Sequence, residues 1–400
     1  MMMKELLKAK FIKMLCCVLC VITLAYSQTN KAQDDKRFSK EDKKKIILNL
    51  KQKVMLPGSK AFLGVYKQKL VKVDSENRLQ IVKEFKPNQE IKVTGDENRL
   101  GILNRIGEGS YTFEMRKITD EVLFKIEDKP FNYFLVSPLG KFVVGIRSKD
   151  ILPTPRTTYT YYFYSSQGIE KGKVGPFMTK NHSFSPDGQA FVLNSRKQGL
   201  IAFGPEGNIL WQVQGNYWSF AVSNGARYVV SGSDGKPYFL KGFKMGKEIW
   251  HLDSPNRVTG ISISSNGNYA SVGDIGSLKF INVNNGSIEW KRLLKDEEHA
   301  VTSMSVSNEG LIAFSTEKKI PARQGIPQHF GSDKIFIYGP KGERLLERNA
   351  SYSYWKGGPP ELKFTDDSQV MFFGIPEKNL FIDCREYKKR IKKEFKKKND

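Results

Sequence analysis

The chain has 400 residues and a net charge of +23, and apolar residues make up 39% of it. So much apolar material excludes a chain that is disordered throughout, and the 26 Phe and 16 Tyr favour sheets over helices. Much of the positive charge lies near the ends, because residues 28–59 carry nine basic and four acidic residues, and residues 384–400 carry nine and three.

Residues 1–27 have the pattern of a secretory signal peptide. Four lysines form a basic start, residues 14–24 are an uncharged apolar run, and Ala25 and Ser27 stand where a signal peptidase reads small residues. We expect cleavage before Gln28 and a secreted or periplasmic protein. A membrane anchor is disfavoured, because the apolar run is shorter than the about 20 residues that span a bilayer.

Residues 28–59 form a polar N-terminal arm with one predicted helix. Ser39 stands before two acidic residues, which suits a helix N-cap followed by acids in the first turn. Four apolar residues within 46–54 recur at helical spacing, so the sequence predicts a helix over about 40–54. We favour an arm packed on the next domain over a free interaction helix, because an apolar stripe needs a surface to cover it.

From residue 60 to 384 the strands are short and bounded by Gly, Asn, Asp or Pro, which predicts an all-β domain. Over residues 181–292 one unit repeats: a strand, a Ser-Pro-Asp-Gly or Ser-Asn-Gly turn, two more strands and a closing Gly-x-x-x-Trp. The closing pairs are Gly207 with Trp211, Gly246 with Trp250, and Gly286 with Trp290. Their glycines lie 39 and 40 residues apart, and a period near 40 with four short strands predicts β-propeller blades.

Seven units can be counted by their first strands. These strands are expected near Ile91, Phe134, Phe184, Phe220, Ile261, Met304 and Leu362. The sequence therefore predicts a seven-bladed propeller of four-stranded blades, with six or eight blades as alternatives and short helical extensions at both ends. The last unit shows three strands before Cys384. Since an open ring would expose unpaired strand edges, we expect an N-terminal strand within 79–85 to supply the fourth strand and close the ring.

The repeats resemble two propeller families. The turns SPDGQAF at 185–191 and SNGNYA at 265–270 are similar to those of WD-repeat-like propellers, and the closing runs GPEGNILWQV and NVNNGSIEWKR resemble the quinoprotein (PQQ-type) repeat. Quinoprotein dehydrogenases, which these repeats resemble, hold their quinone with acidic calcium ligands and adjacent cysteines. This chain has no adjacent cysteines after the signal segment, so we expect no cofactor. The glycines then serve tight turns with positive φ, and the tryptophans pack between blades.

No catalytic or metal-binding motif is recognised. The sequence lacks His-Glu-x-x-His, a pair of Cys-x-x-Cys motifs and Gly-x-Ser-x-Gly, so neither a zinc site nor a nucleophile elbow is predicted. Cleavage would leave Cys384 alone, so no internal disulfide is expected. The four histidines are dispersed and are expected at surface or loop positions: His182, His251, His299 and His329. We expect a binding protein, with a hydrolase or lyase that uses an acidic residue of the central funnel as the alternative.

Two insertions break the period, at 148–158 and 318–332. In WD-type propellers the loops between the second and third strands gather on one face with the blade-to-blade linkers, and the resemblance implies the same here. The implied partner-binding face is basic and aromatic, with Arg156, Lys180, Trp218, Arg257, Lys319, Arg323, His329, Tyr354, Trp355 and Lys356. Loops on a rigid scaffold commonly carry function, so we expect a protein partner here; ordinary loop decoration is the alternative.

The tail, residues 385–400, is strongly basic. Tyr387, Ile391 and Phe395 lie four apart, which predicts a helix with a narrow apolar stripe and a broad basic face. An alternative function is therefore binding to an anionic surface, such as acidic polysaccharide or phospholipid headgroups. Lysine-rich ends also simply keep proteins soluble. No nucleic-acid recognition motif is present, so nucleic acid is not expected as a partner, and a monomer is the default expectation.

Overall fold

The computed structural model describes most of residues 50–384, together with Ser39, residues 42–43 and residue 46. Outside the described residues lie 1–38, 40–41, 44–45, 47–49, 56–60, 75–77, 95–98, 108–109, 130, 132, 152–155, 234, 295–297, 321–328, 354–360, 365–369, 375–378 and 385–400. The predicted signal peptide and the basic tail therefore fall outside the described residues. Within the described part, no helix is long and apolar enough to cross a membrane.

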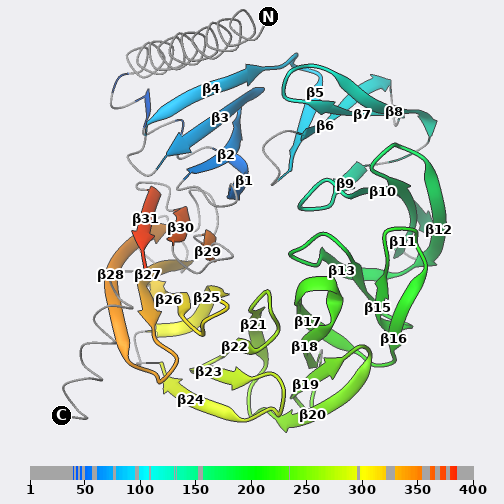
Figure 1. The fold of residues 1–400 in the computed structure, drawn as a ribbon. Coiled ribbons are helices and arrows are strands. Elements are labelled where there is room, and N and C mark those ends of the chain that lie inside the picture. The colour runs from blue at the N-terminus through cyan, green and yellow to red at the C-terminus, as the bar shows by residue number, and fades with distance from the viewer. Residues whose placement is uncertain are drawn as a thin grey trace, which may run out of the picture.

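The described strands form antiparallel sheets around a central axis, and successive strands of each sheet run from the inside of the ring to its outside (Figure 1). Seven of these sheets have four strands, so the prediction of an all-β propeller with seven four-stranded blades is confirmed. A further sheet of three strands ends the described chain. A short 3-10 helix, η1 (Asn224–Ala226), lies in a turn between two strands.

The first three sheets contain β1 (Lys51–Met55), β2 (Ala61–Tyr66), β3 (Lys69–Asp74) and β4 (Leu79–Glu84); β5 (Gln89–Val93), β6 (Arg99–Gly107), β7 (Ser110–Lys117) and β8 (Val122–Lys129); and β9 (Tyr133–Val136), β10 (Phe142–Ile151), β11 (Arg156–Ser165) and β12 (Glu170–Phe177). The next two contain β13 (Thr179–Phe184), β14 (Phe191–Ser195), β15 (Gly199–Phe203) and β16 (Ile209–Val213); and β17 (Tyr217–Val222), β18 (Tyr228–Ser233), β19 (Phe239–Lys244) and β20 (Lys247–Asp253).

The last three sheets contain β21 (Val258–Ile263), β22 (Tyr269–Asp274), β23 (Ser277–Asn282) and β24 (Ile288–Leu293); β25 (Glu298–Val306), β26 (Ile312–Ile320), β27 (His329–Tyr338) and β28 (Arg344–Ser353); and β29 (Glu361–Phe364), β30 (Val370–Gly374) and β31 (Asn379–Asp383). The seven expected first strands are present as β5, β9, β13, β17, β21, β25 and β29, each at one end of its sheet.

The predicted closure of the ring is wrong. The segment 79–85, expected to complete the last blade, contains β4, which pairs with β3 in the first sheet. Strands β1 to β4 therefore satisfy one another's backbone groups in a blade of their own. They precede the first unit that the sequence count recognised.

The N-terminal arm is shorter than predicted. The backbone N–H of Asp42 donates to Ser39 Oγ at 3.0 Å, as in a helix N-cap, and helical residues follow. β1 begins at Lys51 and pairs with β2, so the predicted helix over 40–54 extends too far at its C-terminal end, and the strands of the first blade begin before residue 60. Pairing with β2 overrides the helical spacing of the apolar residues, because a ladder partner decides strand formation more than local propensity does.

The end of the arm packs on the first blade. Ile46 and Leu50 are buried in one apolar cluster with Phe62, Val71 and Val73 of β2 and β3. The arm therefore covers the first blade with its apolar side.

The repeated tryptophans pack between neighbouring blades. Trp211 Nε1 donates to the carbonyl oxygen of Ala226 in the next blade at 3.0 Å, and Trp250 Nε1 donates to that of Val283 at 2.7 Å. A Cβ on Gly246 would lie 2.8 Å from Trp211 Cβ, and this glycine has φ +75°. Gly246 thus gives the tight turn and also makes room for the tryptophan of the preceding blade.

The same contact recurs in the following blades. A Cβ on Gly286 would lie 2.6 Å from Trp250 Cγ, and one on Gly342 would lie 3.1 Å from Trp290 Cγ. Buried aromatic and aliphatic side chains fill the remaining space between successive blades, so the core is a series of clusters around the ring.

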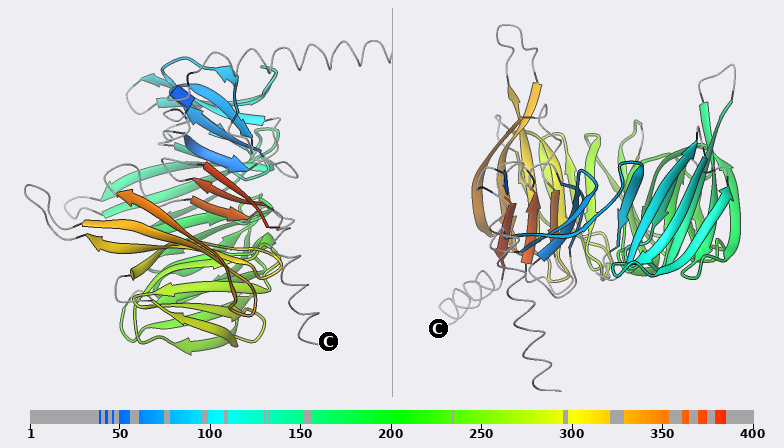
Figure 2. Two further views of the ribbon diagram at one scale, coloured as in Figure 1. Left: turned by 90° about the vertical axis from the view of Figure 1, so that its left-hand side faces the viewer. Right: turned by 90° about the horizontal axis from the view of Figure 1, so that it is seen from above.

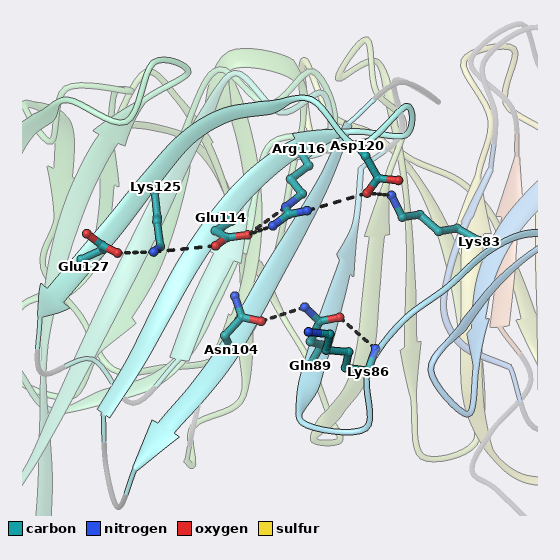
Figure 3. Close-up of polar contacts among 9 residues, drawn as sticks. All are labelled: Lys83, Lys86, Gln89, Asn104, Glu114, Arg116, Asp120, Lys125 and Glu127. Atoms are coloured by element: carbon teal, nitrogen blue, oxygen red, sulfur yellow. Dashed lines mark hydrogen bonds and ion pairs between the residues drawn. The ribbon is translucent and has the colours of Figure 1, made fainter.

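The contact between the first two blades also contains charged side chains (Figure 3). Arg116 of β7 contacts Glu114 at 2.5 Å and Asp120 at 3.7 Å. Lys83 of β4 reaches across from the first blade to form an ion pair with Asp120, and Lys125 lies 4.0 Å from Glu114. An ion-pair network therefore joins the outer part of these two blades, beside a smaller apolar cluster nearer the axis.

Candidate protein-binding face

Two blades have exceptionally long middle strands. β10 pairs with β11 without interruption from Phe142↔Ser165 to Ile151↔Arg156, and β26 pairs with β27 from Ile312↔Tyr338 to Ile320↔His329. Both hairpins extend past the other blades on the same side of the ring (Figure 2). We call this side the hairpin face. The connections from blade to blade lie on this side as well. The innermost strand of each blade is antiparallel to the second strand, so it begins at the end of the sheet where the second strand finishes.

The insertions at 148–158 and 318–332 were expected to be loops, and for most of their described length they are strands instead. Residues 148–151 and 156–158 belong to β10 and β11, and β26 and β27 likewise extend to Ile320 and from His329. Threonine and tyrosine dominate the start of β11, and both residue types favour strands. Backbone pairing therefore follows the described length of both projections.

Trp218 and Arg257 meet on the hairpin face. Trp218 is the second residue of β17, and Arg257 directly precedes β21 of the next blade. The guanidinium carbon of Arg257 lies 3.8 Å from the centroid of the Trp218 ring, and the tryptophan is 43% exposed. A guanidinium on an indole face is a favourable cation–π contact, worth about 0.5–1 kcal/mol at exposed sites. It leaves a rigid surface that is both aromatic and cationic.

Lys180 is fixed next to this pair. Its Nζ donates to Asn216 Oδ1 at 2.6 Å and to the Tyr217 carbonyl oxygen at 3.0 Å. The amide of Asn181 donates to the carbonyl oxygen of Trp218 at 3.2 Å. Three side chains from β13 and from the linker before β17 thus hold the backbone that carries Trp218.

Tyr217 also holds this segment in place. The tyrosine is 2% exposed, and its hydroxyl donates to the carbonyl oxygen of Gln214 at 3.0 Å. Burial, with a smaller contribution from the charge of Glu248, raises the pKa of Tyr217 to about 12. The hydroxyl therefore stays protonated and keeps its donor role at any physiological pH.

A buried ion pair lies at the turn that contacts Asn256, the residue before Arg257. Lys279 Nζ lies 2.5 Å from Asp274 Oδ2, and Ser277 Oγ donates to Asp274 Oδ1 at 2.7 Å. These contacts fix the turn between β22 and β23. The carbonyl oxygen of Ile275 in this turn accepts a hydrogen bond of 2.7 Å from the Asn256 side chain, directly beside Arg257.

A cluster of aromatic rings packs against β13, the strand that carries Lys180. Tyr161 donates from its hydroxyl to Thr179 Oγ1 at 2.9 Å, and burial raises the pKa of Tyr161 well above its usual value. The ring of His182 packs against those of Tyr161 and Phe191, with centroids 6.3 and 5.6 Å apart. His182 was expected in a surface or loop position, and this is wrong, because it lies on β13 among aromatic side chains. Burial lowers its pKa.

Known proteins share this fold at low sequence identity. No protein-family model matches the chain, and no curated protein matches it in sequence. Among solved structures, the computationally designed Ika8 protein has a TM-score of 0.57 at 14% identity, and the match covers 84% of this chain and 96% of that one. Sqt1 of Saccharomyces cerevisiae has a TM-score of 0.54 at 11% identity, with the same coverages of 84% and 96%.

One of the similar structures contains a bound partner. Sqt1 of Chaetomium thermophilum, bound to the N-terminus of the ribosomal protein L10, has a TM-score of 0.52 at 11% identity, covering 84% of this chain and 96% of that one. At such identity these likenesses show the β-propeller fold. They do not carry residue roles to this chain.

The structure brings together three of the ten residues predicted for the partner-binding face: Lys180, Trp218 and Arg257. Arg323, Tyr354, Trp355 and Lys356 lie outside the described residues, and only the backbone positions of Arg156, Lys319 and His329 on the long hairpins are described.

Sequence reasoning missed the residues that hold this face in place, namely Asn181, Asn216, Asn256, Asp274 and Lys279. One sequence signal was available, because several of these polar residues stand at the start of an inner strand or in the linker before it. Asp274 and Lys279 were a second signal, because they are charged residues in a strand hairpin whose other residues are mostly apolar or small.

The described residues of the hairpin face carry aromatic, cationic and hydrogen-bonding groups. Within the described residues, no group of three or more His, Cys, Asp or Glu side chains is placed to hold a metal ion. The features of this face are an exposed indole, a stacked guanidinium, an ammonium held by two hydrogen bonds and two long hairpins. Tryptophan and arginine are the residue types most enriched among those that dominate binding energy at protein interfaces.

Proposed function

We propose that this protein is an exported, monomeric β-propeller that binds a protein partner through its hairpin face. The observation that carries the proposal is the Trp218–Arg257 stack, which is exposed yet held by hydrogen bonds from both flanking blades. A fixed aromatic and cationic surface loses little conformational entropy when a partner binds, so more of the contact energy appears as affinity.

Three further observations support this proposal. The long hairpins project on the same side as the stack (Figure 2) and offer contact surface beyond the rim. Sqt1, which shares the fold, is itself bound to a protein segment. The basic start, apolar run and small residues of 1–27 are the basis for export.

We further infer that the blades belong to the WD-repeat-like and quinoprotein-like class of repeats. The support is the position of the Gly-x-x-x-Trp pairs, whose tryptophans lie against the closing glycine of the next blade. In this protein the repeat serves as a scaffold. The function then lies with the residues that break the 40-residue period, such as the insertions at 148–158 and 318–332.

Site-specific photo-crosslinking tests the proposed face. A photoreactive phenylalanine analogue is placed at Trp218 or, as the control, at Ile288 on the outermost strand β24; these side chains are 43% and 44% exposed. In the fraction that contains the exported protein, we expect a discrete protein adduct from position 218 and none from 288. Equal adducts from both positions, or none from 218, would contradict the proposal.

A second candidate function is tethering to an anionic surface. The net charge of +23 and the basic tail favour it, although the tail lies outside the described residues. Binding to vesicles that contain anionic lipid should fall steeply as salt rises, and should be lost when residues 385–400 are removed. Binding that is insensitive to salt would argue against this candidate.

A further inference from the structure

Trp218 is the only exposed aromatic residue among those whose side chains the structure describes. A second apolar residue of the hairpin face, Ile275 in the turn between β22 and β23, is 45% exposed. Its carbonyl oxygen accepts a hydrogen bond from Asn256, the residue before the arginine that stacks on Trp218. Trp218, Arg257 and Ile275 therefore form one continuous surface over two neighbouring sheets, and we call these three residues the Trp218 patch.

The sheet that precedes Trp218 in the ring contributes further cations. Lys180 Nζ donates at 3.0 Å to the backbone carbonyl oxygen of the residue before Trp218. Arg196 and Lys197 are exposed in the turn between β14 and β15, the second and third strands of that sheet, so this turn lies on the hairpin face. The backbone N–H of Arg196 donates at 2.9 Å to the carbonyl oxygen two residues before Lys180. Cations of the preceding and the following sheet therefore flank the indole.

The described carboxylates at this end of the neighbouring sheets do not offset these cations. Asp274 is buried and already paired with Lys279. Asp150 accepts a hydrogen bond within the long β10–β11 hairpin. The side chain of Asp253 is 97% exposed, but it ends β20, the outermost strand of its sheet, whereas Trp218 belongs to the innermost strand. The surface around the indole is therefore positively charged.

A ligand complementary to this surface carries negative charge beside an apolar group. The cations attract carboxylates, and the indole and Ile275 favour an apolar side chain that loses its water on contact. Single-stranded nucleic acid also combines negative charge with apolar rings, but it stacks successive bases on several aromatic side chains. The described part of this face has one exposed aromatic ring, so an acidic protein segment fits it better.

We propose that the hairpin face recognises a segment of its partner protein in which an apolar residue stands between acidic residues. The apolar side chain packs on Trp218 and Ile275. One carboxylate pairs with Arg257, whose guanidinium binds carboxylates through two parallel hydrogen bonds, and the other pairs with Arg196 or Lys197 of the preceding sheet. This inference rests on the protein-binding function proposed for the hairpin face, and it names the chemistry of the partner.

A phage-displayed library of random peptides of about ten residues, the length of a long strand, tests the proposal without a sequence chosen in advance. The full chain is the target, and the Trp218→Ala chain removes peptides that bind elsewhere. The retained peptides should contain more Asp and Glu than Lys and Arg, with an apolar residue between two acids. Retained peptides without this acidic excess would overturn the proposal while leaving the protein-binding function in place. If no peptide requires Trp218, both fail.

Two double charge reversals separate local contact from net charge. Arg196→Glu with Lys197→Glu changes the turn beside the Trp218 patch. Lys244→Glu with Lys247→Glu is the matched control, because these exposed lysines flank the β19–β20 turn at the opposite end of their sheet. In fluorescence anisotropy with a selected acidic peptide, the first variant should lose about tenfold in affinity and the control less than about twofold. Equal losses would overturn the proposal, since net charge alone would then explain the binding.

A single-stranded oligothymidylate with the same negative charge as the peptide is the second ligand in this assay. If it binds more tightly than the peptide and requires Trp218, the face recognises nucleic acid and the proposal is overturned. Thermal unfolding shows whether each variant keeps its fold. If the double reversal beside the patch does not fold, Arg257→Gln takes its place, and unchanged affinity of that variant for the selected peptide would overturn the proposal.

Discussion

Replacing Lys279 with Met removes the cation of a buried ion pair while keeping an aliphatic side chain of similar length. Lys279 and Asp274 are 5% and 1% exposed. After the change, the carboxylate of Asp274 keeps the hydrogen bond from Ser277 but loses its ammonium partner. An unpaired charge left in such a site costs about 3–5 kcal/mol, so the free energy of unfolding should fall by about that amount.

Urea unfolding followed by tryptophan fluorescence measures this loss. The double variant Lys279→Met with Asp274→Leu is the matched control, because it leaves no unpaired charge and only the Ser277 hydroxyl loses its hydrogen-bond acceptor, so it should be more stable than Lys279→Met alone. A loss below about 1 kcal/mol for Lys279→Met alone would refute the reasoning, since that is the range of an exposed pair.

Three further predictions concern single positions. Arg257→Ala should weaken binding of the crosslinked partner by about tenfold or more, with a smaller loss at high salt, and titration calorimetry at two salt concentrations measures it; a loss independent of salt would indicate lost packing rather than lost charge. Gly246→Ala should destabilise the fold by about 1–3 kcal/mol, because φ is +75° and the Cβ would meet a tryptophan, whereas Gly235→Ala, with open space around it, should be near neutral in the same thermal unfolding assay. Burial lowers the pKa of His182 below 6.5, so the unfolded chain binds the proton more tightly and stability should fall as pH drops below about 6.5; His182→Phe should lack this part of the pH dependence, and identical pH profiles would contradict the assignment.

The sequence predicted the blades well where each blade repeats its own local signals. Gly246 and Trp250 mark a turn and an interface that recur in three successive blades, so their spacing gives the period directly. The first blade has no such closing pair, and its first strand, β1, follows residues with helical spacing. Its pairing with β2 is a contact that local pattern does not encode, so the arm was predicted to continue as a helix.

The candidate site was predictable only in part, for a related reason. Trp218 and Arg257 were selected as rim residues because they lie in linkers between blades, and linkers of a propeller meet at one side. Their stacking depends on the relative placement of two blades, which no single repeat specifies. The hairpins were mistaken for loops because Pro and charged residues near 148–158 resemble a loop, while the strand ladder forms through long pairing of β10 with β11.

Binding of a protein to the hairpin face is tested most directly by the affinity of the crosslinked partner for three forms of the chain. Trp218→Ala should raise the dissociation constant by about 30-fold, which corresponds to about 2 kcal/mol. Ile288→Ala, a substitution of equal exposure on an outer strand, should leave it unchanged. Equal affinity of all three forms, with the fold intact, would contradict the account.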